Sequence, residues 1–535
     1  MFEGVGLGVL SIQSRGLPST NKASMASPLE EDKLKQKLDP KQAEKRDKEL
    51  IERIHSQYAR QQAREEAIIN SNHTLPVTIN EVRVLQATHT RRGFLERIVN
   101  PLLSANRDDA YTLLEARQEI DKVGQKLEKF GIYKSPVTAF VDKADPSNPL
   151  STPTDLNVFF QAQERGRYTL KTGTEAGSSE GSAYVDAHLR NIFGGAESLG
   201  AHASLGTRTR SSYSALFNTP ILSNPDRQFE IGGLVSSTLK PWASHEERLR
   251  GGDAKFRWIT EGGQKHEFGY SGIWRQITGL AENASPTVRL NAGDSFKSSL
   301  THTWVNDKRD YPLLPSRGYL LKTISEIAGF GPLKGDVGFG KVEVETQGAL
   351  PIPIPGIAGD SGISFNVGLR GGMLYPLTQA GEDTPIQSRL NDRFQLGGPT
   401  DVRGFKISGL GPHENGDAVG GDLYAAGGAS LLFPFPRVGK DTPLRLQLFA
   451  NAGRLLALNG KSKDRTPLSS DDVAANMKKT FEEMRNGLPS CAAGVGIVYA
   501  HPMARFELNF SLPLVLRKGE EGRKGVQFGV GISFL

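Results

Sequence analysis

The 535-residue sequence lacks what marks several common classes of protein. It contains one cysteine, Cys491, which excludes an intramolecular disulfide framework and a zinc site built from cysteines. It has no apolar run of about 18 residues, which excludes an ordinary membrane-spanning helix but not a membrane β-barrel, whose strands alternate. The net charge is only +6, and no basic patch is interleaved with aromatic residues, so we expect no nucleic-acid partner.

Motifs for catalysis and cofactor binding are also missing. There is no His-Glu-x-x-His, no Gly-x-Ser-x-Gly and no paired-cysteine spacing, and the ten histidines are scattered. Residues 335–342 nearly fit a phosphate-binding loop, but Val342 stands where Ser or Thr would hold magnesium, and a strand pattern follows where a helix is required. We therefore expect a protein that is not an enzyme, with no catalytic residue, no metal and no cofactor.

The N-terminal part of the chain divides into a tail and a small α/β domain. Met1 to Leu10 carries Glu3 and no Lys or Arg, so it is a poor secretory signal, and we expect residues 1–76 to form a disordered, charged tail. Residues 77–165 predict a strand at 77–84, helices at 93–103 and 108–130, and strands at 137–141 and 156–160. This order resembles a POTRA domain, the chaperone-like module attached to outer-membrane assembly barrels.

Residues 166–535 carry strand after strand. We expect an all-β membrane barrel of 16 antiparallel strands, preceded by one N-terminal α/β POTRA domain. A soluble β-sandwich or propeller is the alternative, but no repeat of about 40 residues is present and the two faces of the strands alternate too regularly. The predicted strands begin near Arg167, Glu180, Leu199, Ser212, Arg227, Gly252, His266, Phe296, Ser316, Asp336, Ser361, Gly421, Leu444, Ala492, Met503 and Gly525.

The last strand, Gly525 to Phe534, alternates most clearly. Its apolar residues share one face, which we expect to meet lipid, and its small or polar residues share the other. A terminal strand must pair at both edges or remain an exposed template, and in a barrel it would close the sheet against strand one. The predicted lipid face consists of Val526, Phe528, Val530, Ile532 and Phe534.

A long connection of about 45 residues joins the predicted strands eleven and twelve, and connections of this length are usually functional. It contains the sequence Val402-Arg403-Gly404-Phe405. As a tetrapeptide this is compatible with a surface turn in which Gly404 supplies a positive φ. In this position it resembles the loop-six motif of the outer-membrane assembly superfamily that includes the bacterial BamA barrel. That resemblance implies a loop folded into the lumen, with Arg403 meeting a patch on the wall.

A matching wall patch is present on the predicted strand thirteen. Phe449, Asn451 and Gly453 resemble the family's Phe-x-Asp-x-Gly motif, and they share the face of the polar residues Arg445 and Gln447. Asn451 replaces the acid, so we expect docking without the charge assistance of an arginine–carboxylate pair at this position. The turn Tyr311 to Tyr319 is similar to the family's Pro-x-Arg-Gly-Tyr turn, although an ordinary tight turn explains its Pro and Gly equally well.

The terminal strand carries a further resemblance. Gln527, Gly529, Ile532 and Phe534 fit the polar-x-Gly-x-x-hydrophobic-x-hydrophobic targeting signal of mitochondrial barrels. Together with the POTRA-like order, the sixteen strands and the loop-six motif, this resembles the barrel subunits of the mitochondrial sorting and assembly machinery (SAM). The alternatives are a bacterial or plastid assembly or secretion barrel of the same superfamily, and a passive porin-like channel.

The resemblance implies a function, partners and a location. The protein would insert β-barrel precursors into the mitochondrial outer membrane through a lateral seam between strand sixteen and strand one, which includes Lys171 and Thr172. Precursor proteins, membrane lipid and peripheral SAM subunits on the cytosolic side would be its partners, and the POTRA domain would lie in the intermembrane space. The seam would act by β-augmentation, in which a precursor strand adds to an open sheet edge.

The insert at residues 461–489 lies on the same side of the predicted barrel as loop six. Its pattern predicts a helix at 471–484 with Val473, Met477 and Phe481 on one stripe. It fits either a solvated loop helix or a helix that docks a partner on the cytosolic side.

Overall fold

The computed structural model describes residues 71–535 except for 106–109, 145–150, 178–179, 354–360, 379–384, 386, 437, 440–441, 459–469, 532–533 and 535, together with isolated residues 53, 56, 60, 64 and 67. The chain forms two compact units. The first contains the described residues up to Arg167 with the turns Arg190–Glu197 and Leu222–Pro225, and the second contains the rest. The predicted tail lies mostly outside the described residues. No helix among them is long and apolar enough to cross a membrane.

The first unit is a small α/β domain. Its elements are β1 (Pro76–Leu85), α3 (Arg92–Ala105), β2 (Tyr111–Thr112), α4 (Leu113–Lys129), β3 (Thr138–Lys143) and β4 (Asp155–Gln161), and its sheet has the order β2-β1-β4-β3. The two helices bury Ile98 and Leu127 with Phe160 of β4 in one core. The helix predicted from Asp108 begins instead at Leu113, because Thr112 and Glu115 form a capping box there.

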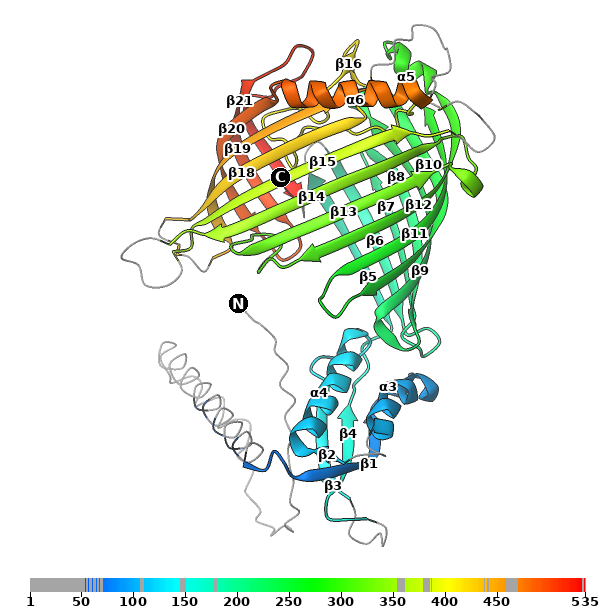
Figure 1. Cartoon of the computed structure of the whole chain (residues 1–535), viewed down its shortest axis with the longest axis vertical. Coiled ribbons are helices and arrows are strands. Elements are labelled where there is room, and N and C mark those ends of the chain that lie inside the picture. The colour runs from blue at the N-terminus through cyan, green and yellow to red at the C-terminus, as the bar shows by residue number, and fades with distance from the viewer. Residues whose placement is uncertain are drawn as a thin grey trace, which may run out of the picture. The chain divides into compact units, whose positions relative to one another are not determined.

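The second unit is a sheet of 16 antiparallel strands wrapped into a barrel (Figure 1), which confirms the predicted fold class. The predicted start of one strand is wrong by seven residues, because β10 begins at His245 rather than at Gly252. The strands are β5 (Tyr168–Gly177), β6 (Glu180–Arg190), β7 (Ser198–Gly206), β8 (Thr209–Ile221), β9 (Asn224–Lys240), β10 (His245–Ile259), β11 (Lys265–Thr278), β12 (Gly293–Asp307), β13 (Gly318–Ala328), β14 (Phe339–Pro351), β15 (Ser364–Pro376), β18 (Leu423–Pro434), β19 (Leu444–Leu456), β20 (Ser490–Ala500), β21 (Arg505–Val515) and β22 (Gly525–Gly531).

Short elements and one longer helix lie in the connections. The connection between β19 and β20 contains α6 (Ser470–Asn486), so the helix predicted at 471–484 is present. The segment between β15 and β18, residues 377–422, is called loop six below. The remaining elements are η1 (Pro241–Ala243), α5 (Pro286–Leu290), η2 (Gly331–Leu333), β16 (His413–Glu414) and β17 (Asp417–Ala418).

The wall alternates between exposed apolar and buried polar side chains where β21 and β22 pair. Leu508 and Phe510 are exposed on one face, whereas Glu507, Asn509 and Gln527 are buried on the other. Period-two alternation places the first set on the outside of the barrel and the second set in its lumen. This is the pattern of a strand with lipid on one side and a filled interior on the other.

The terminal strand departs from its predicted course. β22 ends at Gly531 rather than Phe534, and Ile532 lies outside the described residues. The prediction that Phe534 shares the lipid face is wrong, because its ring is buried against the guanidinium groups of Arg403 and Arg505 in the lumen. Its carbonyl oxygen accepts a hydrogen bond from Gln347 Nε2 of β14 at 3.2 Å, so Phe534 lies inside the barrel and not in its wall.

Candidate functional site

Loop six folds against the inside of the barrel wall. Two β-bridges, Phe394 with Gly421 and Leu396 with Leu410, hold the loop to itself. Five of its apolar side chains are buried in one core with residues of the wall. The loop residues in this core are Phe394, Leu396, Val402, Phe405 and Leu410, and the wall residues include Leu374, Ala426, Leu455 and Ala492.

Arg403 forms a buried ion pair with Glu507 of β21. Arg403 Nε donates to Glu507 Oε2 at 2.8 Å, and Nη2 donates to Oε1 at 3.0 Å. The two side chains are 1% and 0% exposed. Arg505 Nη2 lies 2.6 Å from the same carboxylate, and Asn509 Nδ2 donates to it at 2.7 Å. A buried carboxylate with this many donors is well compensated for the loss of water.

The predicted wall patch also surrounds Arg403. The Asn451 amide, with its oxygen turned to the loop, accepts from Arg403 Nη1 and from the Arg403 backbone N–H at 3.1 Å each. The Phe449 ring lies 5.1 Å from the guanidinium carbon. The structure therefore brings Arg403, Phe449 and Asn451 together, and it adds Glu507, which belongs to no motif in the sequence. An acidic residue on the inward parity of β21 was the only sequence feature that pointed to it.

Two glycines allow loop and wall to approach closely. Gly404 has φ +87°, and a Cβ there would lie 2.6 Å from the Ala492 Cβ. A Cβ on Gly453 would lie 3.0 Å from Val402 Cγ2. Gly404 needs both the backbone freedom and the missing side chain, whereas Gly453 needs only the space.

The terminal strand binds the same loop. Gln527 Oε1 accepts from the Gly404 N–H at 2.8 Å, and Gln527 Nε2 donates to the Phe405 carbonyl at 3.0 Å. A Cβ on Gly529 would lie 3.2 Å from the Pro399 carbonyl oxygen. The polar residue and the glycine of the predicted targeting signal therefore both face the loop.

The base of the loop is held to another part of the wall. Arg275 Nη1 of β11 donates to Asp392 Oδ1 at 2.5 Å, and both side chains are buried. Nearer the tip, Gly397 N–H donates to Asp401 at 2.9 Å, and burial raises the pKa of the Asp401 carboxyl. Loop six therefore spans the lumen between β11 and the β21–β22 pair.

The seam residues on strand one lie away from this cluster. Lys171 and Thr172 are exposed on β5, opposite Asp186 and Val185 of β6. The strands β5 and β22 stand at the two ends of the sheet order and lie beside each other. Among the described residues, no backbone pairing joins them.

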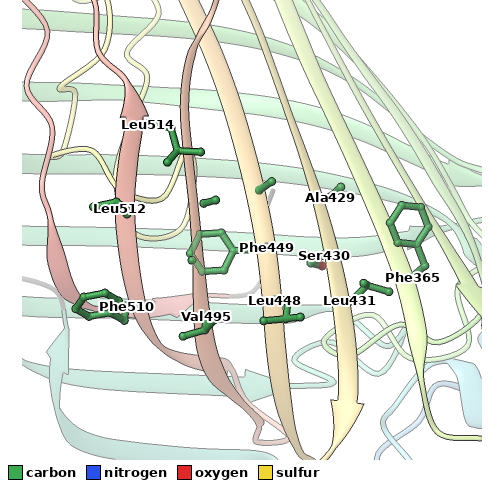
Figure 2. Close-up of a pocket in the computed structure, with 13 residues that line it drawn as sticks. Phe365, Ala429, Ser430, Leu431, Leu448, Phe449, Val495, Phe510, Leu512 and Leu514 are labelled. Carbon is green, nitrogen blue, oxygen red and sulfur yellow. The ribbon is translucent and has the colours of Figure 1, made fainter.

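The outside of the wall next to the docking site is apolar. Figure 2 shows a shallow hollow across β19, β20 and β21, bordered by Leu448, Val495, Phe510 and Leu512. Among the described residues, no group of three or more His, Cys, Asp and Glu side chains is placed to hold a metal ion.

Fold and site together define a class: a sixteen-stranded outer-membrane barrel with a loop docked through an arginine in its lumen. The model of the Omp85 superfamily domain matches residues 191–534. BamA from Haemophilus ducreyi lacking POTRA domains 1–3 has the same fold, with a TM-score of 0.63 at 14% identity, covering 85% of this chain and 84% of that chain. These matches agree with the fold predicted from the loop-six motif.

Two curated relatives narrow the class. A SAM50-like protein of Schizosaccharomyces pombe is 37% identical over 88% of this chain and 93% of its own length. The sorting and assembly machinery component 50 homolog of Homo sapiens is 34% identical over 80% of this chain and 85% of its own length. The chain belongs to the sorting and assembly machinery component 50 family of the Omp85 superfamily, which confirms the predicted resemblance.

Proposed function

We propose that the protein inserts β-barrel precursors into the mitochondrial outer membrane, and that it does so at the seam between β22 and β5. The observation that supports this position for the seam is the order of the sheet, which ends at these two neighbouring strands. Membership of the family supports barrel insertion as the activity and the mitochondrial outer membrane as the location. In this arrangement the POTRA domain faces the intermembrane space, and peripheral subunits of the complex bind on the cytosolic side.

The physical problem that such a protein solves is the unpaired strand. In lipid every backbone N–H and C=O needs a partner, so a single precursor strand cannot enter the bilayer alone. An edge that already stands in the membrane supplies those partners by β-augmentation. Hydrogen bonding and burial of apolar side chains drive the process, so the proposed role needs no nucleotide and no catalytic step.

Loop six fits this role as a support for one side of the seam. Gln527 ties β22 to the loop, and Arg403 ties the loop to β21, so three adjacent elements are held from the lumen. On the other side of the seam, Lys171 and Thr172 of β5 remain exposed. We propose that β22 is held by the loop while the edge of β5 receives the precursor.

Disulfide scanning tests the proposal. In a Cys491→Ser background, Thr172→Cys and Lys171→Cys are each paired with cysteines along the last strand of an arrested precursor. Adjacent residues of a strand face opposite sides, so the two variants should crosslink to precursor positions of opposite parity, in one register. Crosslinks without register would overturn pairing at β5. No crosslink at any position, with the barrel folded in the membrane, would favour a passive channel.

A further inference from the structure

Helix α6 covers part of the outer wall near the end that carries loop six. Leu423 and Arg454 face outward by strand register but are only 5% and 6% exposed. On the same face, Leu369 and Leu448 lie farther along their strands and are 57% and 45% exposed. The helix contacts β15 and β19 (Figure 1), and Arg454 Nη1 donates to the Met484 carbonyl at 3.4 Å.

The sides of α6 differ in chemistry. Val473, Met477 and Thr480 are buried and form the stripe that meets the wall. Phe481 follows Met477 by four residues, at the edge of that stripe, and is 49% exposed. Lys478 and Arg485 stand three residues before and four residues after Phe481, so they share its flank and are also exposed.

The opposite side of α6 carries Glu483 and Lys479 and lies toward the loop end of the wall. Glu483 interacts electrostatically with Arg454, which also interacts with Glu520 of the β21–β22 turn. The flank that carries Phe481, Lys478 and Arg485 therefore points away from the loop end of the wall. Below the helix, the outward residues of the same strands form the exposed apolar wall that we assign to lipid.

We infer that α6 lies in the headgroup layer of the bilayer, with Phe481 at the boundary of the acyl chains. Lys478 and Arg485 then reach the lipid phosphates while their stems cover apolar surface. A helix with one apolar edge and a basic flank is suited to this layer, and its position continues the lipid-facing wall. The inference rests on the proposed membrane location.

Spin labels on single cysteines test the placement. In a Cys491→Ser background, labels are introduced by Phe481→Cys, by Lys479→Cys on the other side of the same helix, and by Leu448→Cys on the wall. The protein is reconstituted in vesicles that contain anionic phospholipid, and collision rates with oxygen and with a water-soluble nickel complex are compared. Labels at 481 and 448 should collide mainly with oxygen, and the label at 479 mainly with nickel.

The wall label separates two kinds of failure. If 448 reports lipid while 481 matches 479, the placement of α6 is overturned and the membrane location stands. If 448 also reports water, the proposed membrane location fails. A label at 481 that is exposed to nickel in vesicles and is protected only when other subunits of the complex are added would overturn the lipid assignment in favour of a protein partner.

Discussion

Arg403 reaches its partners through the fold rather than through sequence proximity. Its carboxylate partner, Glu507, follows it by more than a hundred residues and sits on the inward face of β21. Taking two charges out of water is costly, and the geometry offsets that cost only while every donor and acceptor is matched. The pair therefore makes the docked position of loop six specific, because any displacement leaves a buried charge.

Replacing Glu507 should destabilise the barrel much more than replacing an exposed acid of the same region. Glu507→Gln leaves Arg403 and Arg505 without a carboxylate, and breaking a buried pair costs about 3–5 kcal/mol. The control is Glu521→Gln, whose pair with Lys406 is exposed and worth about 0–1 kcal/mol. The measurement is the free energy of unfolding in urea of the protein reconstituted in lipid. Equal losses in the two variants would contradict the assigned role of the buried pair.

The fit between loop six and the wall depends on glycines whose backbone lies directly against a side chain of the facing element. The loop approaches β19 and β20 so closely that each of two contacts has a glycine on one side. Gly404 faces Ala492, and Gly453 faces Val402. Interiors are close-packed, so a single added methyl group must displace either the loop or the strand.

This fit can be dissected with a double-mutant cycle. Gly404→Ala should destabilise the barrel for two reasons: the new Cβ meets the Ala492 Cβ, and φ of +87° is unfavourable for alanine. Ala492→Gly should relieve the first cause and not the second, so the double variant should retain a deficit of about 1–2 kcal/mol. The stability of each variant is measured by semi-native electrophoresis, as the temperature at which the band of the folded barrel is lost. No rescue at all would mean that the close contact with Ala492 is not the source of the clash.

The elements were predictable from the sequence to different degrees. Strands followed from period-two alternation, which is a local property of the chain, so all sixteen were found. The partner of Arg403 could not be predicted in this way, because several polar residues face the lumen and only the folded position of the loop selects Glu507. Phe534 was misplaced because alternation assumes that a strand continues, whereas β22 ends at Gly531 and two guanidinium groups attract the ring into the lumen.

At the scale of the whole molecule, the two edges of the sheet are unequal. β22 spans Gly525–Gly531, whereas β5 at the other edge spans Tyr168–Gly177, so the terminal strand offers a shorter ladder. The inner face of β22 is nevertheless held by loop six through Gln527. On β5, Tyr168 and Leu170 are exposed large apolar residues on the outward side of the strand, where a further strand at this edge would lie beside them. This asymmetry favours movement at the seam over movement within the wall.

A tether across the seam should therefore stop precursor assembly, whereas a tether within the wall should not. Thr172→Cys combined with Val526→Cys or Phe528→Cys, in a Cys491→Ser background, is closed with a short reducible thiol crosslinker. The control pair Leu508→Cys and Phe528→Cys joins directly opposed residues of β21 and β22. Assembly of a radiolabelled barrel precursor is followed by native electrophoresis of isolated mitochondria. We expect a block with the seam tether, recovery on reduction and normal assembly with the control. Undiminished assembly through a fully tethered seam would require the precursor to enter elsewhere, because a closed β5–β22 edge cannot accept another strand.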